Sequence, residues 1–94
     1  MENDIALDWD QSNIEHIRGH GVTPDQVLQV FANEARDLRY EVMNSEERWT
    51  SIGHTDALRI LGAVWTMRGE SIRTVTAFDA GKRVAAEYVV KRGW

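Results

Sequence analysis

The chain has 94 residues, a net charge of −4 and no cysteine, with 43% hydrophobic and 28% charged residues. This length suits one domain with a modest core, and the absence of cysteine excludes disulfides, thiolate metal sites and cysteine nucleophiles. No apolar run approaches the roughly 20 residues that span a bilayer, and the acidic start at Met1 lacks the pattern of a signal peptide. We therefore expect a single domain over residues 1–94, in the cytoplasm and away from membranes.

Charge is distributed unevenly along the chain. Residues 1–34 carry seven acidic and one basic side chain, whereas residues 71–94 carry two acidic and five basic ones. Either a polyanion approaches the C-terminal third, or the two ends neutralise each other in the fold.

The first third predicts a short strand followed by a helical hairpin. Residues 5–9 alternate in the manner of a strand, and Asp10 is a good N-cap for a helix over residues 11–19. Thr23, Pro24 and Gln26 then form the start of a second helix, with a capping box and proline at its first position. This helix should end near residue 33.

Four further runs predict strands, and a final run predicts a helix. The strands are residues 38–43, 49–54, 58–66 and 71–78, rich in β-branched and aromatic side chains. Their short connections favour antiparallel pairing. The first of them alternates like a half-buried strand, and in the last Arg73 should share the face of Val75 and Ala77. Asp79 can cap a helix that runs to about Arg92. The fold class is therefore α+β, with about four antiparallel strands plus the short N-terminal one.

Three histidines are candidates for proton transfer. His16 lies between apolar positions of a helix, and His20 precedes a glycine at a helix end; both positions are more typical of structural histidines. His54 ends a strand beside a turn, at the rim of the sheet. A histidine there can act as general acid or base because its pKa lies near neutrality, or it can simply be solvated. The histidines lack metal-ligand spacing, so we predict no metal and no cofactor.

Basic residues on the strands and the last helix are candidates for phosphate binding. Arg73 in mid-strand is costly to bury, so we expect it either to pair with an acid or to point into a phosphate site. Lys82 and Arg83 lie in the first turn of the last helix, where backbone N–H groups also favour an anion. Routine surface ion pairs are the alternative for these residues.

Several motifs, taken in order, resemble one family. They are the pairs Trp9-Asp10 and Ile52-Gly53, the triplet Glu47-Arg48-Trp49, and residues 13–17, 20–24 and 72–77. Together they resemble the BrnT-type toxins, the small ribonuclease halves of bacterial type II toxin–antitoxin pairs. The resemblance covers nearly the whole chain.

The resemblance implies a RelE-like α+β fold, metal-independent RNA cleavage and a cognate antitoxin that is a small DNA-binding protein. In that chemistry the RNA 2′-OH attacks the adjacent phosphate while cations stabilise the developing charge. His54 stands where the family commonly has arginine and is a further candidate for the catalytic acid–base group. Matched positions imply catalytic roles for Arg48, Arg73 and His20, and RNA or phosphate contacts for a second group. That second group is Lys82, Arg83 and Tyr88.

Two positions of this chain depart from the pattern of the family it resembles. Phe78 and His54 stand where the family commonly has arginine, and the chain is acidic where family toxins are typically basic. Three hypotheses follow: an endoribonuclease toxin, a module that binds an antitoxin or other partner without cleaving RNA, and a plain RNA-binding domain. The sequence leaves a homo-oligomer and a hetero-oligomer both open.

Overall fold

The computed structural model describes residues 5–94, and within them it has three helices and one four-stranded antiparallel sheet. The order along the chain confirms the predicted α+β class. The acidic start at residues 1–4 lies outside the described residues. The elements are α1 (Gln11–Arg18), α2 (Pro24–Ala32), β1 (Arg36–Met43), β2 (Glu46–His54), β3 (Ile60–Arg68), β4 (Ser71–Asp79) and α3 (Lys82–Arg92).

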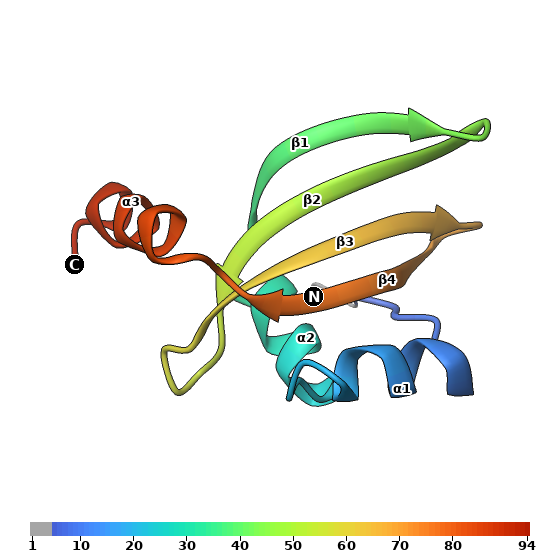
Figure 1. The fold of residues 1–94 in the computed structure, drawn as a ribbon, viewed down its shortest axis with the longest axis horizontal. Coiled ribbons are helices and arrows are strands. Elements are labelled where there is room, and N and C mark those ends of the chain that lie inside the picture. The colour runs from blue at the N-terminus through green and yellow to red at the C-terminus, as the bar shows by residue number, and fades with distance from the viewer. Residues whose placement is uncertain (1–4) are drawn as a thin grey trace.

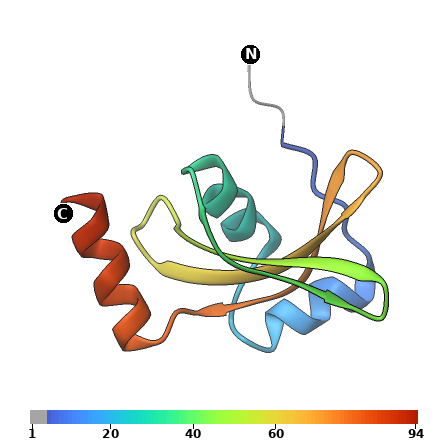
Figure 2. The ribbon, with the colours of Figure 1, turned by 90° about the horizontal axis from the view of Figure 1, so that it is seen from above.

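The sheet has the simple order β1-β2-β3-β4, as the short connections predict. In Figure 1 β1 lies at the top and β4 at the bottom, with α1 and α2 beneath β4 and α3 to the left of the strands. Figure 2 shows α3 apart from the two N-terminal helices, at the opposite end of the sheet from the β1–β2 turn. At that turn Asn44 and Ser45 both have positive φ, of 53° and 66°, the conformation of the tight turns that join twisted hairpin strands.

The N-terminal helical hairpin begins as the capping residues predict. The Asp10 side chain accepts a hydrogen bond from the Asn13 N–H at 2.8 Å. Thr23 and Gln26 form the reciprocal capping box, with proline at the first helical position of α2. These contacts satisfy N–H groups that a helix start otherwise leaves unpaired.

The core lies between this hairpin and the β3–β4 half of the sheet. It consists of seven buried side chains: Ile17, Val22, Val27, Val30, Leu61, Ala63 and Ala77. α2 also packs against Gly53 of β2, whereas β1 has no helix against most of its length (Figure 1).

The prediction of a half-buried strand at residues 38–43 is therefore wrong. Leu38, Tyr40 and Val42 are 55%, 52% and 58% exposed, although they alternate with polar residues as core-facing side chains do. The alternation correctly indicates a strand, but no element covers the face on which the apolar side chains lie.

Two predicted boundaries also differ. Leu58 lies in a loop with φ of 69°, so β3 begins at Ile60. Asp79 ends β4 and does not cap α3, whose N-cap is Gly81 without a side-chain hydrogen bond. The Asp79 carboxylate is held by Arg59 instead, at 2.8 and 3.0 Å.

The short N-terminal strand is present only as a single bridge. Leu7 pairs in parallel with Ile72 of β4, with hydrogen bonds from the Asp8 N–H to the Ile72 carbonyl and from the Ile72 N–H to the Ala6 carbonyl. This segment covers the β4 edge of the sheet. None of the helices in residues 5–94 has the length and apolar character needed to cross a bilayer.

Candidate functional site

The sheet face turned away from α2 carries three of the seven predicted site residues, Arg48, His54 and Arg73. On β2, Gly53 faces α2 so closely that an added Cβ would lie 2.7 Å from Val30 Cγ1. The flanking residues Ile52 and His54 must therefore point to the opposite side. We call this side the open face. By strand register it holds Arg36, Arg39 and Glu41 of β1, Arg48, Ile52 and His54 of β2, Gly62 and Thr66 of β3, and Arg73, Thr76 and Phe78 of β4.

Arg48 and Arg73 lie in one row across this face. Trp49 pairs with Trp65, so Arg48 lies beside Thr66, and Thr66 pairs with Arg73 on its other side. Strands are spaced by about 4.8 Å, which puts the two arginine Cα atoms about 10 Å apart. The β1 residues Arg36 and Arg39, which pair with Ile52 and Thr50, extend the same cationic face.

Both arginines of the row already have an acidic partner. The Nε of Arg48 lies 2.9 Å from a Glu46 carboxylate oxygen, and Nη2 of Arg73 lies 3.6 Å from Asp10. The Asn13 N–H and then Arg73 lower the pKa of Asp10, which therefore stays ionised. Of the two alternatives for Arg73, the structure has the paired one, and this pair ties the start of α1 to β4.

A β-bulge in β4 moves Arg73 from its expected face. Val64 pairs with Thr76 and Trp65 with Thr74, so Val75 is the extra residue. Thr74 and Ala77 are consequently both buried on the helix-covered side, and Arg73 lies on the open face. The prediction that Arg73 shares the face of Ala77 is wrong because strict alternation does not continue through a bulge.

His54 and Tyr88 form the closest pair of predicted site residues. The Nδ1 of His54 lies 2.7 Å from the Tyr88 hydroxyl, which brings the end of β2 against the middle of α3. Tyr88 is buried, with 3% of its surface exposed, and His54 is half-buried. In the tautomer whose Nδ1–H donates to Tyr88, Nε2 of His54 can accept a proton.

The surroundings of His54 favour its neutral form. Burial of the ring and then the positive charge of Arg92 lower the pKa of His54 below its usual value of 6.5, while Asp56 acts weakly in the other direction. A neutral imidazole at physiological pH is the form that a general base requires.

Arg92 and Trp94 hold α3 in place beside this pair. One Arg92 nitrogen donates to the carbonyls of Asn33 and Glu34 at 2.9 and 2.7 Å, and the guanidinium lies 5.2 Å from the centre of the Tyr88 ring. The Trp94 ring meets the His54 ring edge-on at 4.8 Å. These contacts anchor α3 at the end of α2 and over the end of the sheet.

A cavity of about 380 Å³ opens between the start of β1 and α3, next to Tyr88. Its volume is within the range of about 300–1,000 Å³ typical of small-molecule sites. Apolar walls and charged side chains of both signs line it: Arg36, Asp37, Leu38, Ile52, Val84, Glu87, Tyr88 and Lys91.

The predicted catalytic residues do not form one cluster. His54 follows Arg48 by six residues in the same strand, a separation of about 20 Å. Cations beside the His54–Tyr88 pair include Arg36 and Lys91, which line the same cavity as Tyr88, and Arg92. The structure therefore has a histidine–tyrosine pair at one end of the open face and a row of arginines towards the other.

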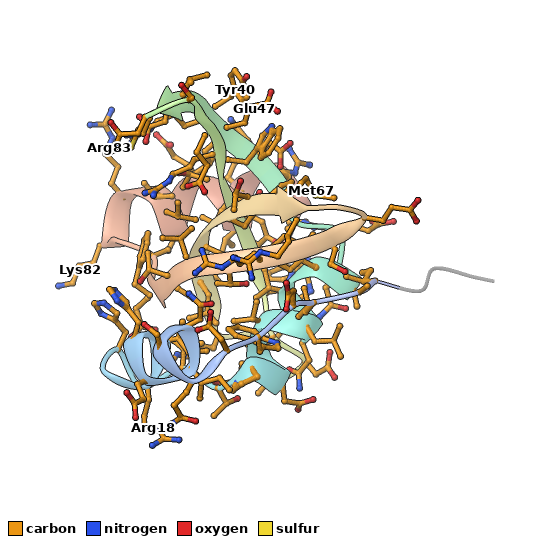
Figure 3. All side chains as sticks on the ribbon, turned by 90° about the vertical axis from the view of Figure 1, so that its right-hand side faces the viewer. Arg18, Tyr40, Glu47, Met67, Lys82 and Arg83 are labelled. Carbon is orange, nitrogen blue, oxygen red and sulfur yellow. The ribbon has the colours of Figure 1, made fainter. Side chains whose placement is uncertain are left out.

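The remaining predicted residues lie apart from both groups. Figure 3 shows Lys82 and Arg83 directed outward from the start of α3, where Arg83 pairs with Glu87, one turn along, at 3.7 Å. His20 lies after α1, with its ring 5.9 Å from that of His16 and 6.4 Å from that of Phe78. Phe78 in turn lies over Gly62, because a Cβ added there would be 2.7 Å from the phenylalanine ring.

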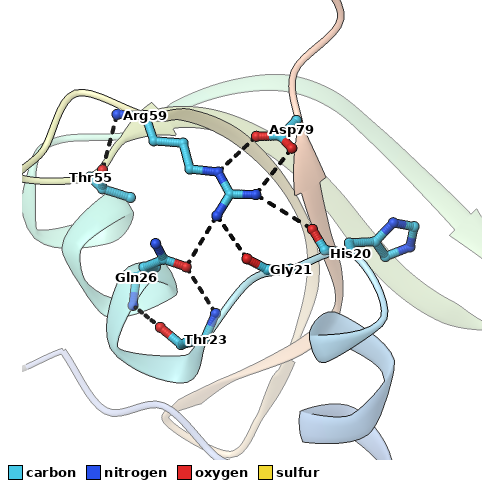
Figure 4. Close-up of polar contacts among 7 residues, drawn as sticks. All are labelled: His20, Gly21, Thr23, Gln26, Thr55, Arg59 and Asp79. Carbon is cyan, nitrogen blue, oxygen red and sulfur yellow. Dashed lines mark hydrogen bonds and ion pairs between the residues drawn. The ribbon is translucent and has the colours of Figure 1, made fainter.

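Arg59 binds the turn between α1 and α2 to the end of β4 (Figure 4). Besides its two bonds to Asp79, its guanidinium donates to the Gly21 carbonyl at 2.8 Å and, at 3.4 Å, to the His20 carbonyl and the Gln26 side chain. Arg59 lowers the pKa of Asp79, which stays ionised. This arginine is thus part of the scaffold, and His20 meets it through its backbone.

Within residues 5–94, no three histidine, aspartate or glutamate side chains are placed to hold a metal ion together.

A family model described as "Ribonuclease toxin, BrnT, of type II toxin-antitoxin system" matches residues 9–83. The chain belongs to the BrnT toxin family. Membership implies a ribonuclease toxin with a cognate antitoxin as its partner. No curated protein matches the chain.

The BrnT match includes the open face but ends at the second residue of α3. Arg48, His54, Arg73 and His20 lie inside it, whereas Tyr88, Arg92 and Trp94 lie beyond. The part of this BrnT protein that completes the His54 environment is therefore outside the matched region.

The sequence pattern did not single out Arg36, Arg39 or Arg92. Arg36 and Arg39 share the open face only because of a bulge between Asp37 and Arg39, which sequence spacing does not reveal. The sequence indicates only that Arg92 is a favourable charge at a helix C-terminus. The packing of α3 is what brings it over the Tyr88 ring.

Proposed function

We propose that this BrnT protein cleaves RNA without a metal ion, by attack of a 2′-OH on the adjacent phosphate, and that His54 moves the proton. The observation that carries this proposal is the 2.7 Å contact between His54 and the buried Tyr88 hydroxyl, at the end of a face rich in arginine.

In the proposed reaction Nε2 of His54 takes the proton from the 2′-OH. The O2′–P bond forms, the P–O5′ bond breaks, and the departing 5′ oxygen receives a proton from an acid or from water. A well-placed base of this kind contributes about 10²–10⁴-fold to the rate. Arg36 and Arg92 are cations beside this point, and their positive charge would stabilise the negative charge that develops on the phosphate.

Arg39, Arg48 and Arg73 have a different role in this proposal. They are too far from His54 to touch the same phosphate, so they bind the RNA backbone on one side of the cleavage point. Each phosphate contact contributes a salt-dependent term to affinity. Lys82 and Arg83 are directed outward at the start of α3, where they would meet RNA only beyond the open face. His20 would act there only through its packing against Phe78.

We further propose that the antitoxin is a small DNA-binding protein encoded beside this chain, and that the pair acts in the cytoplasm.

A second candidate function is a partner-binding module without cleavage. Phe78 favours it, because this apolar ring covers Gly62 in the middle of the open face, at a position where related toxins commonly have arginine. The two candidates differ in one observable, the cleavage of RNA by the purified chain.

The test uses the full chain, purified apart from any antitoxin, and a labelled RNA in buffer with EDTA. Cleavage that leaves 2′,3′-cyclic phosphate ends is expected, and the same RNA with 2′-O-methyl groups throughout should stay intact. Cleavage that requires an added divalent metal, or cleavage of the 2′-O-methyl strand, would contradict the mechanism. Binding without cleavage would favour the second candidate.

A further inference from the structure

The two edges of the sheet differ in how they are covered. At the β4 edge, Ala6 and Asp8 hydrogen-bond to Ile72. At the other edge β1 pairs only with β2 among the described residues. An uncovered edge presents a row of N–H and C=O groups that can pair with another strand.

The side chains of β1 are unusually apolar for an open edge. Leu38, Tyr40, Val42 and Met43 are all exposed, and they account for four of the ten large hydrophobic side chains exposed in the described part of the chain. Figure 3 shows Tyr40 beside Glu47 at one extremity of the molecule, well away from Lys82 and Arg18. The Tyr40 hydroxyl donates to Glu47 at 2.7 Å and its ring lies 5.4 Å from that of Trp49, so two contacts within the chain hold this side chain.

The charges of β1 are self-complementary about Tyr40. If two copies of β1 pair antiparallel with Tyr40 opposite Tyr40, Arg39 of each copy faces Glu41 of the other, and Leu38 faces Val42. Opposite charges and apolar side chains that face each other across two strands stabilise the pairing. A shift of the centre by one residue instead places Arg39 against Arg39 or Glu41 against Glu41, and like charges directly opposite are unfavourable. A centre at Leu38 falls on the bulge between Asp37 and Arg39, which interrupts regular pairing.

We propose that this chain forms a symmetric dimer by antiparallel pairing of β1 with β1 of a second copy, centred on Tyr40. The contact is isologous, and it joins the two four-stranded sheets into one of eight strands. In such a pair the twofold axis is perpendicular to the sheet, so the open faces of both copies lie on the same side. The inference does not depend on the proposed RNA cleavage.

The experiment measures the mass of the full chain, purified without antitoxin, by sedimentation equilibrium over a range of concentrations. The parent chain, of 10.8 kDa, is expected to associate to twice that mass. The single variants Arg39→Glu and Glu41→Arg should each raise the dimer dissociation constant at least tenfold, because each creates two like-charge pairs. The double variant Arg39→Glu/Glu41→Arg should restore the parent value, since it reverses both partners of each pair.

Controls separate the interface from the fold. Arg83→Glu, a reversal at a highly exposed site on α3, should leave the association unchanged. Circular dichroism and thermal unfolding show whether each variant folds. A parent chain that stays monomeric throughout, or a folded double variant that fails to recover, would overturn the proposal. If the chain is monomeric and Arg39→Glu instead weakens capture of the cognate antitoxin, β1 belongs to that partner and the dimer is wrong.

Discussion

The chemistry proposed for this protein depends on one hydrogen bond between two side chains from distant parts of the chain. His54 ends a strand and Tyr88 lies in the last helix, and their 2.7 Å contact fixes the imidazole ring. A fixed ring with one nitrogen occupied leaves the other nitrogen for proton transfer, provided that the tautomer is the one that donates to tyrosine.

Tyr88→Phe keeps the ring and removes only the hydroxyl. We expect the cleavage rate to fall at least tenfold, because the His54 tautomer and orientation are no longer fixed. The free energy of unfolding should fall by only about 1 kcal/mol. The matched control is Tyr40→Phe, which loses an equally short hydroxyl contact to Glu47 on the far side of the molecule. Equal losses of activity in both variants would show that the Tyr88 hydroxyl has no specific role.

The pH dependence of cleavage reports on His54. Its pKa lies below 6.5 because burial and Arg92 disfavour the imidazolium, so the acid limb of the rate profile should have its midpoint below 6.5. Between the lowered pKa of folded His54 and pH 6.5, this histidine is protonated in the unfolded chain but neutral in the folded protein. The free energy of unfolding should therefore decrease as the pH falls through this window and lose that dependence in His54→Asn. A midpoint above 6.5 would contradict the assignment.

At the scale of elements, α2 and β2 approach each other most closely at Gly53. A Cβ there would lie 2.7 Å from Val30 Cγ1, 3.1 Å from the Val30 carbonyl oxygen and 3.2 Å from Ala35 Cβ. We expect Gly53→Ala to lower the free energy of unfolding by about 1–3 kcal/mol, as overpacking does. Gly81→Ala is the control: its added Cβ meets nothing within 4 Å, and the cost should stay below about 1 kcal/mol, measured by urea unfolding.

The C-terminal helix is held by few contacts, and Arg92 makes several of them. Arg92→Ala removes two hydrogen bonds to the end of α2 and the contact with the Tyr88 ring. Hydrogen exchange in α3 should become at least tenfold faster, with little change in the sheet, because the helix loses its anchor. Arg83→Ala removes a cation from the same helix without such contacts, and exchange in that variant should match the parent. Unchanged protection of α3 in Arg92→Ala would sink this account of its docking.

Secondary structure could be predicted from the sequence where the signal is local. The capping box at Thr23 and Gln26 and the alternation of β-branched residues in β2–β4 indicated the right elements. Which side chains are buried was harder to predict from the sequence. Tyr40 and Val42 alternate like core residues, yet they are exposed, because periodicity identifies a face without saying what covers it.

At the scale of the whole molecule, the sequence indicated the family and a set of candidate site residues, but not how these residues are grouped in space. Arg48, His54 and Arg73 do share one face. The bulge at Val75, which places Arg73 there, and the docking of α3, which brings Tyr88 and Arg92 to His54, depend on tertiary structure. The six-residue spacing of Arg48 and His54 in one strand already separates these two, but nothing in the sequence indicates that Tyr88 pairs with His54.

This separation gives the central claim its most direct test, a comparison of RNA affinity and single-turnover cleavage in EDTA for two variants. His54→Asn retains a nitrogen near the position of Nδ1, so it should bind RNA like the parent and cleave it about 10²–10⁴-fold more slowly. Arg48→Ala should instead weaken binding and reduce the dependence of affinity on salt by about one phosphate contact, with cleavage of bound RNA nearly unchanged. Cleavage by His54→Asn at the parent rate would contradict the account.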